Sequence, residues 1–456
     1  MSHREGAGRR VGMVRRELGR LRLASKVLAE PDVRWAQIAY LGANIAEMAT
    51  WVAILVYAFN AGGAGLVGVV AAVQLVVAGL LAPWLASLGD RFARRTVLLG
   101  WYTAMVVTSA SVAVALFTGM SVVVVVALAA ADAAAVSAAR PIHASLLPAL
   151  TRRPWETVAA YSLSGVVEGS GLLFGPLMAG LILAAASPGA VYLASAAVMV
   201  VSAGGVLAVR GGRVVVDPED GSSVGPAGGI RALMASNEVR WLVGLGGLSQ
   251  VVIGALDILL VVLAIDVLGL GDAGAGYLNA LLGLGAIVGS IASGRLAGRR
   301  RLGAAVRSAG ELRGLSLAAV GAVPQAFPLL VLTGAGQAYL DVAGRSLLQR
   351  MVPARVISLA FGVVESMSMF GLAVGALAVP VLIGAVGPTG ALVAVGLLLP
   401  VAVLIASRSL ERADRASALP AGVVEVLEAA DAFASLEVVG IEELALGSEV
   451  GQVEAG

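Results

Sequence analysis

Residues 165–180 read GVVEGSGLLFGPLMAG, which places Glu168 in a long apolar run with no basic residue within ten positions on either side. The start of this run returns as GVVESMSMFG at 362–371. A carboxylate inside an apolar segment costs free energy unless it faces a cavity or a partner. The stretch therefore indicates a chain that is organised around apolar helices, and an acid that serves a purpose within them.

The whole chain is as apolar as this stretch. Of its 456 residues, 59% are hydrophobic and 13% are charged, and the mean hydropathy is +0.93. A membrane-spanning helix needs roughly 20 apolar residues. Such runs predict an all-α membrane protein with twelve transmembrane helices, at 35–59, 64–87, 96–117, 121–142, 157–186, 189–209, 241–265, 275–293, 303–323, 328–349, 356–384 and 388–407. The ninth run is the least apolar, because it contains Arg307, Glu311 and Arg313.

Basic residues are confined to alternate loops between these runs. The loops NAGGAG, TGM, AASPG, DVLGLGDAGAG, PQAF and AVGPTG contain no Lys or Arg, whereas the intervening loops are rich in Arg. Because basic loops resist translocation, we predict that both termini are cytoplasmic. The basic, amphipathic arm at 1–34 is then expected to lie on the inner membrane surface, and no apolar core of a signal peptide follows its charges.

Two short repeats predict that the chain is duplicated. EVRW at 238–241 repeats DVRW at 32–35, and GVVE recurs at the same relative place in a later helix. The polar segment 210–240 then reads as a cytoplasmic linker between two six-helix halves, 35–209 and 241–407. Because each half has an even number of helices, the repeats are parallel, and transporters of this kind bind substrate near the midplane and work by alternating access.

Several acids lie deep in predicted spans. An acid at this depth costs roughly 2.5–3.5 kcal/mol on insertion scales. Loss of hydration favours the protonated form of a carboxyl group, so such acids can couple transport to a proton gradient. The candidate acids are Glu47, Asp132, Glu168, Asp257, Asp341 and Glu365. The alternative is that some of them only join helices, through Arg140, Arg345 or serine hydroxyls.

Glu168 has a further argument, because it shares a helix face with small and polar residues. Ser164, Gly165, Glu168, Gly171 and Gly175 follow each other at helical spacing, and Glu365, Ser368, Gly371 and Gly375 nearly repeat the pattern. We expect both stripes to face an interior cavity. The dipeptide Arg140-Pro141 is predicted to end the fourth span. We expect His143, near the cytoplasmic end of that span, to be an interfacial side chain, and a proton relay is the alternative.

The loop ASLGDRFARR at 86–95 resembles the signature of the major facilitator superfamily, at Asp90, Arg91, Arg94 and Arg95. Ala86 and Ala93 replace glycines of that signature. The resemblance implies that these residues latch the two halves by charge pairs, whereas the arginines alone would only anchor the loop. The matching loop SIASGRLAGRRR at 290–301 has Gly294 in place of the acid, so we expect an asymmetric latch.

The segment GLLFGPLMAG resembles an antiporter signature, at Gly171, Gly175, Pro176 and Gly180, with Ala179 in place of one glycine. Gly171 and Gly175 lie one turn apart, so a neighbouring backbone can approach closely, and Pro176 loosens the helix. The resemblance implies export. Ordinary packing of small residues is the alternative.

Together with NIAEMATWVAILVYAF and RPIHASLLPAL, these motifs make 32–407 similar to the macrolide-efflux and siderophore-exporter branch of the superfamily. The resemblance implies a monomeric transporter of the bacterial cytoplasmic membrane that exports an amphipathic small molecule in exchange for protons. The fourth span lacks the arginine-glutamine-glycine signature of many drug/proton antiporters. Uptake by symport, and a membrane sensor with a transporter fold, are the alternatives.

Other functional classes find no support in the sequence. There is no cysteine and there are only two histidines, so we expect no metal site, and we expect no cofactor and no nucleic-acid partner. No nucleophile–base pair or phosphate loop indicates an enzyme.

The tail, 408–456, is acidic and has helix-like apolar spacing. Its segments VLEAADAFASL and IEELAL are similar to the opening helices of a cyclic-nucleotide-binding domain. That resemblance implies regulation by a cyclic nucleotide in a longer form of the chain, because this sequence stops before the pocket would begin. A disordered cytoplasmic tail is the alternative.

Overall fold

The computed structural model describes residues 27–86, 93–151, 153–210, 233–234, 236–293, 302–352 and 357–416. The basic arm before residue 27, most of the 210–240 linker and the tail beyond 416 lie outside this range. So do Asp90, Arg91 and Gly294 of the two signature loops. The predictions made for these segments therefore stay predictions.

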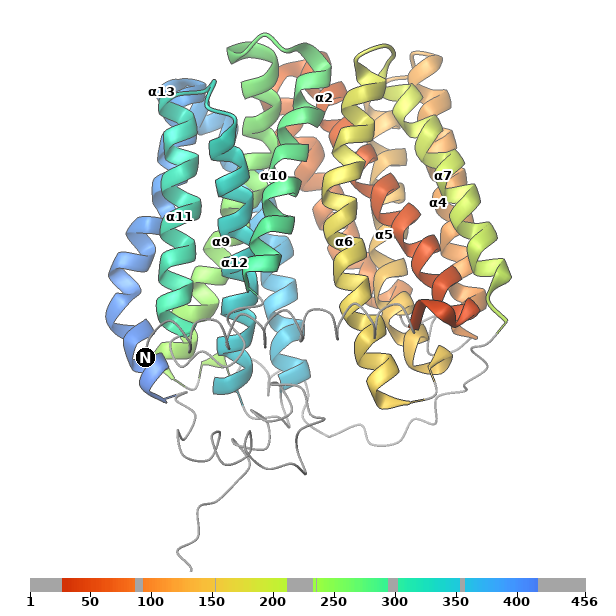
Figure 1. Ribbon diagram of the computed structural model, residues 1–456. Helices are drawn as coiled ribbons and strands as arrows, with labels where there is room; N and C mark the ends of the chain where they lie inside the picture. The colour runs from red at the N-terminus through yellow and green to blue at the C-terminus, as the bar shows by residue number, and fades with distance from the viewer. Residues whose placement is uncertain are drawn as a thin grey trace, which may run out of the picture. The chain divides into compact units, whose positions relative to one another are not determined.

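Long helices make up nearly all of the described chain (Figure 1). The first half of the sequence forms α2 (Pro31–Ala86), α4 (Arg94–Phe117), α5 (Val122–Leu150), α6 (Pro154–Leu183) and α7 (Pro188–Ala208). The second half forms α9 (Asn237–Val262), the π-helix η1 (Leu263–Val267), α10 (Gly271–Ser293), α11 (Leu302–Ala322), α12 (Pro328–Met351) and α13 (Ile357–Ala416).

Two of these elements are far longer than the roughly 30 Å core of a bilayer requires. Helix α2 has 56 residues and breaks at Gly62 and Gly63, and α13 has 60 residues and breaks at Gly387. Gly63 and Gly387 have φ of 63° and 74°, which a residue with a Cβ rarely adopts. When α2 and α13 are divided at these glycines, the described chain contains the twelve membrane spans that the hydropathy pattern predicts.

Eight of the described helices could cross a membrane, judged by length and composition alone. This count takes α2 and α13 as one helix each. Helices α11 and α12 fall short of this criterion. In α11 the charges are nevertheless accommodated, because the side chain of Arg313 is fully buried and donates to the Ser249 hydroxyl on α9. Arg307 lies 4.0 Å from Glu411 on α13.

Helix α13 continues to Ala416, about two turns past the predicted end of the last span at 407. Its final turns cap another helix: Asp414 accepts hydrogen bonds from the backbone N–H groups of Gly303 (2.6 Å) and Ala304 (3.1 Å), at the start of α11. A carboxylate at this position satisfies N–H groups that have no partner within their own helix. The last span and the beginning of the predicted tail are therefore one helix.

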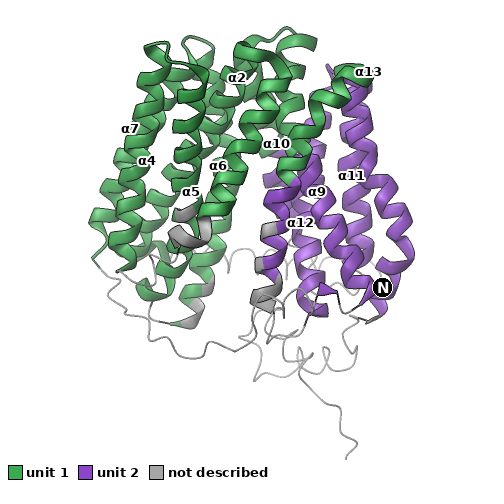
Figure 2. Ribbon diagram, turned by 180° about the vertical axis from the view of Figure 1, so that it is seen from behind, with its two compact units in different colours: residues 1–221, 254–283, 372–388 green, residues 222–253, 284–371, 389–456 purple. Residues whose placement is uncertain are grey.

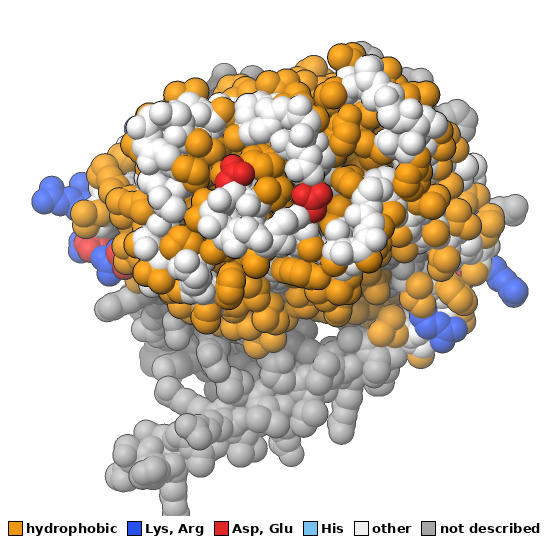
Figure 3. All heavy atoms as spheres, turned by 90° about the horizontal axis from the view of Figure 1, so that it is seen from above, with side chains coloured by type: hydrophobic (Ala, Val, Ile, Leu, Met, Phe, Trp, Pro, Cys, Tyr) orange, Lys and Arg blue, Asp and Glu red, His pale blue; other side chains and the backbone are white. Residues whose placement is uncertain are grey.

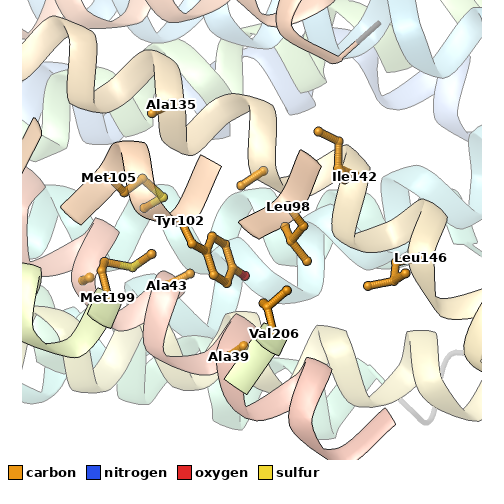
Figure 4. Close-up of a cluster of buried hydrophobic side chains, with 12 residues drawn as sticks. Ala39, Ala43, Leu98, Tyr102, Met105, Ala135, Ile142, Leu146, Met199 and Val206 are labelled. Carbon is orange, nitrogen blue, oxygen red and sulfur yellow. The ribbon is translucent and has the colours of Figure 1, made fainter. Parts of the chain in front are cut away.

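The chain forms two compact units (Figure 2). Unit 1 comprises residues 1–221, 254–283 and 372–388, and unit 2 comprises 222–253, 284–371 and 389–456. In unit 1, a buried cluster from α2, α4, α5 and α7 surrounds Tyr102 (Figure 4). The division into halves at 210–240 stays a prediction.

One helix contact supports the predicted duplication. In unit 1, Gly175 of α6 packs against Met48 of α2 so closely that a Cβ on the glycine would clash. The spacing between the two GVVE copies takes Gly175 to Leu372, and the spacing between DVRW and EVRW takes Met48 to Gly254. Leu372 and Gly254 pack against each other in the same manner. The glycine lies on the opposite helix in the second copy, yet the pair of helix positions is the same.

Candidate functional site

Glu168 lies in a polar cluster of unit 1 that α2, α5 and α6 build together. Its side chain is exposed, and its Oε1 accepts a hydrogen bond of 2.6 Å from the hydroxyl of Tyr40. Tyr40 is itself buried, at 4% exposure. The carboxylate is thus held from one side by a rigid aromatic donor while its other side stays accessible.

The ring of Tyr40 stacks on the ring of His143 from α5. The two ring centroids are 3.9 Å apart and the planes are inclined by only 7°. His143 is 2% exposed, and its Nε2 lies 3.5 Å from the Ser164 hydroxyl on α6. The expectation of an interfacial histidine is therefore wrong.

The reason is the course of α5. The helix was expected to end at Arg140-Pro141, but it continues through Pro141 and Pro148 to Leu150. Packing against neighbouring helices lets a membrane helix tolerate a proline. His143 consequently lies on the same helix as Arg140, one turn further along, and points into the bundle.

Arg140 forms an ion pair with Glu47 next to Tyr40. A single guanidinium nitrogen, Nη2, lies 2.9 Å and 3.0 Å from the two carboxylate oxygens. This pair lines a small pocket together with Tyr40, Ala43, Asn44, Tyr102, Met105, Val136 and Ala139. Glu47 and Arg140 pair with each other, whereas Glu168 forms no ion pair with the residues that the structure describes.

The small residues of the α6 stripe pack along α2, and this corrects their expected orientation. Ser164 contacts Gln37, Gly171 packs on Asn44 and Gly175 packs on Met48. Ser164, Gly171 and Gly175 are buried, whereas Glu168 is exposed. The close backbone approach predicted from the glycine spacing is confirmed, but it joins two helices rather than lining a cavity.

Two further acids of unit 1 accept hydrogen bonds from neutral side chains. Asp132 is buried, and its Oδ1 accepts hydrogen bonds from the hydroxyls of Thr108 and Ser109, the latter at 3.0 Å. Asp257 accepts a hydrogen bond of 3.2 Å from the indole of Trp51. For Asp132, this arrangement matches the alternative in which hydroxyls satisfy the acid.

The last two candidate acids belong to unit 2. Asp341 lies 3.3 Å from Arg345, one turn along α12, and both side chains are largely exposed. Glu365 is exposed and forms no hydrogen bond or ion pair with the residues that the structure describes. The structure thus groups Glu47 and Glu168 with Arg140 around Tyr40, and it places Asp132 and Asp257 with other partners.

The described arginines of the signature, Arg94 and Arg95, donate to backbone carbonyls of α5 and α7. Arg94 donates to the carbonyl of Ser145 at 2.7 Å. Arg95 donates to the carbonyls of Val206 (3.2 Å) and Leu207 (2.7 Å) in the last turn of α7, where a positive charge is favourable. These contacts join the start of α4 to α5 and α7, and the latch role of the signature stays a prediction.

Unit 1 is tightly closed near the Arg-free loops. Gly180 of α6 packs against the backbone around Gly276 of α10, and Gly68 of α2 packs against Ala376 of α13. Nearby, the Asn60 amide donates to both carboxylate oxygens of Asp272, at 2.9 and 3.1 Å. Seen from this end, acidic groups stand out in a largely hydrophobic and uncharged face (Figure 3). The third glycine of the antiporter-like signature thus belongs to this contact region.

Comparison with known families decides the class of protein. Residues 38–328, from α2 to the first residue of α12, match the sequence model of the Major Facilitator Superfamily. The chain belongs to the Major Facilitator Superfamily. No curated protein sequence matches it.

Solved structures agree with this assignment at the level of the fold. A peptide transporter of the POT family is similar with a TM-score of 0.66 at 14% identity, over 84% of this chain and 95% of that one. The nucleoside transporter NupG gives 0.66 at 11% identity, over 84% and 99%. A bacterial homologue of the human lysosomal transporter Spinster, in an inward-facing and unoccupied conformation, gives 0.57 at 13% identity, over 93% and 97%. This member of the superfamily is therefore a multi-pass membrane transporter and not an enzyme.

The sequence contains a signal for the α2 side of the site. Gln37, Tyr40, Asn44 and Glu47 follow each other at spacings of three and four, which places a polar stripe on one face of α2. This stripe runs opposite Ser164, Glu168 and Gly171 of α6. Neither Tyr40 nor Gln37 is ionised at neutral pH, so a search for intramembrane charges overlooks both.

Proposed function

We propose that this transporter exports an amphipathic small molecule in exchange for protons, and that Glu168 carries the proton. The observation behind the proposal is the exposed Glu168 carboxylate beside the paired Glu47 and Arg140. An ion pair that neutralises itself leaves one acid free to change its charge. Proton binding to Glu168 would make the cluster neutral, whereas proton release would leave one negative charge in an apolar bundle.

This change of charge can couple proton movement to substrate movement. The ionised acid attracts a proton or a cationic group, and the protonated, neutral acid no longer attracts a cation. A site that binds either a proton or the substrate, but not both, produces exchange. The Tyr40 hydroxyl supports this use, because it can donate to the ionised acid and can accept from the protonated one.

The contacts near the Arg-free loops support alternating access. Glycines at Gly180, Gly276 and Gly68 let helix backbones touch with few side chains between them. Such contacts can part and reform without repacking a core of large side chains. We propose that they open when the site is presented to the other side of the membrane, in line with the behaviour of parallel-repeat transporters.

The test is transport by the purified protein in proteoliposomes under an imposed pH gradient. For exchange, an acidic lumen drives accumulation of a labelled amphipathic substrate, whichever way the protein is inserted. For symport, an acidic exterior drives it instead. A panel of amphipathic cations and neutral compounds is screened under both gradients, with empty liposomes as the control.

Each result separates the hypotheses. Accumulation driven by an acidic lumen supports exchange, and accumulation driven by an acidic exterior replaces it by uptake symport. Binding of a compound without flux under either gradient would instead support a membrane sensor with a transporter fold. We further propose a monomer in the bacterial cytoplasmic membrane with both termini in the cytoplasm.

A further inference from the structure

The Tyr40 hydroxyl that binds Glu168 is held in place by a second aromatic ring. His143 covers one face of the tyrosine at a centroid distance of 3.9 Å with nearly parallel planes. Both rings are buried, so neither can turn freely without displacing neighbouring helices. The phenol oxygen is therefore fixed at the end of a ring whose plane α5 determines.

His143 is fixed in turn by α6 and α2. Its Nε2 lies 3.5 Å from the Ser164 hydroxyl, and Gln37 donates to the same hydroxyl (2.9 Å) and to the carbonyl of Ala160 (3.0 Å). Ser164 also donates to the carbonyl of Ala160, at 3.2 Å. A continuous set of contacts thus runs from the α6 backbone through Ser164 and His143 to Tyr40, and returns to α6 at Glu168.

The hydrogen bonds indicate that the His143 ring is uncharged. An imidazolium has two N–H donors that both need acceptors when buried. The Nδ1 atom of His143 is buried and has no hydrogen-bond partner among the described residues. The stack is therefore made of two neutral rings, and the histidine serves as a platform and not as a proton carrier.

We propose that His143 is a positioning residue for Glu168: its ring holds Tyr40 so that the hydroxyl stabilises the ionised carboxylate, and this sets the pH at which Glu168 exchanges its proton. The inference rests on the proposed function in one respect, the use of that proton for transport. Among the described residues, the other ionisable groups around this site are Glu47 on α2, Tyr102 on α4 and Arg140 on α5, and Glu47 and Arg140 form an ion pair. They stay unchanged in every variant below.

The experiment is an infrared titration of the purified protein in lipid nanodiscs. The carbonyl band of protonated Glu168 is identified as the band that E168Q lacks, and its midpoint is followed with pH. In Tyr40→Phe the midpoint rises by about one pH unit, because the ionised acid loses a hydrogen bond. In His143→Ala it rises by less, because Tyr40 keeps its hydroxyl but loses its fixed position.

Two further variants isolate the role of the ring. His143→Phe keeps an aromatic platform without ring nitrogens, and the midpoint stays at the wild-type value. In the double variant Y40F/H143A the midpoint equals that of Y40F alone, because the histidine acts only through the hydroxyl. Size-exclusion profiles and melting temperatures show whether each variant is folded. If H143A does not fold, H143F provides the test.

Several outcomes would overturn the inference. An unchanged midpoint in Y40F would remove the role of the hydroxyl. Additive shifts in the double variant would show that the histidine acts independently of the tyrosine. A shift in H143F equal to that in H143A would assign the effect to the ring nitrogens. The titration does not depend on flux. If the midpoints shift as expected but no pH gradient drives transport, the positioning role stands and the proposed function fails.

Discussion

Glu168 and Asp132 are both acids within apolar predicted spans, yet their environments differ. Glu168 is exposed and bound by one phenol, whereas Asp132 is buried and bound by two hydroxyls at the same oxygen. The first arrangement leaves the acid accessible for proton exchange. The second satisfies the acid within the bundle, so that Asp132 joins α4 to α5.

A comparison of two substitutions at Asp132 tests this distinction. Asp132→Asn keeps a carbonyl oxygen that can accept from Ser109 and Thr108, so we expect an unchanged pH profile of transport and little loss of stability. Asp132→Leu removes the acceptor from two hydroxyls, and we expect about 1–3 kcal/mol of destabilisation. Thermal unfolding and the pH profile are measured for both variants, and a lost pH dependence in Asp132→Asn would make Asp132 a proton carrier.

At the scale of helices, close contact between α2 and α6 depends on glycine. A Cβ at Gly175 would collide with Met48 and with the α2 backbone at Ile45, and a Cβ at Gly171 would collide with Asn44. The same face of α6 carries Glu168, so the contact also determines how near the acid lies to Tyr40. Helix packing and site geometry are therefore set together.

Substitution of one α6 glycine tests the contact against a matched position. Gly175→Val should destabilise the protein by about 1–3 kcal/mol, because overpacking displaces α6 from α2. Gly165→Ala on the same helix is the control, because a Cβ at Gly165 would meet no neighbouring atom within 4 Å. Melting temperatures are compared after purification in one detergent. Equal melting temperatures for the two variants would show that α2 and α6 do not need close approach.

The sequence predicts those features that depend on local pattern. Helix number and glycine contacts follow from hydropathy and spacing, and both agree with the described chain. The stack of Tyr40 on His143 and the pairing of Glu47 with Arg140 join residues about a hundred positions apart. Such pairs depend on helix rotation and on the continuation of α5 past Pro141, which no local pattern specifies.

At the scale of the whole molecule, the arginine pattern predicts one orientation in the membrane. The Arg-free loops contain exposed residues such as Met120, and the alternate loops contain exposed residues such as Arg153. The chain has no cysteine, so a single introduced thiol reports the side on which it lies. These two positions therefore test the orientation predicted from the arginine pattern.

We expect Met120→Cys to react with a membrane-impermeant maleimide in intact cells and Arg153→Cys to react only after permeabilisation. Both positions are exposed, so the difference reports the membrane side and not local burial. Labelling is measured by the mass shift of the purified protein. The reverse pattern would place the termini outside and contradict the orientation.

The central claim is that Glu168 carries the proton that is exchanged for substrate. Its most direct test records the lumenal pH of proteoliposomes, with an entrapped indicator, while a transported substrate is added outside. If Glu168 carries the proton, substrate entry alkalinises the lumen of wild-type vesicles. Glu168→Gln then abolishes this change but keeps exchange of labelled for unlabelled substrate, whereas Glu365→Gln behaves like the wild type. Substrate-driven proton movement in Glu168→Gln that equals the wild type would contradict the account.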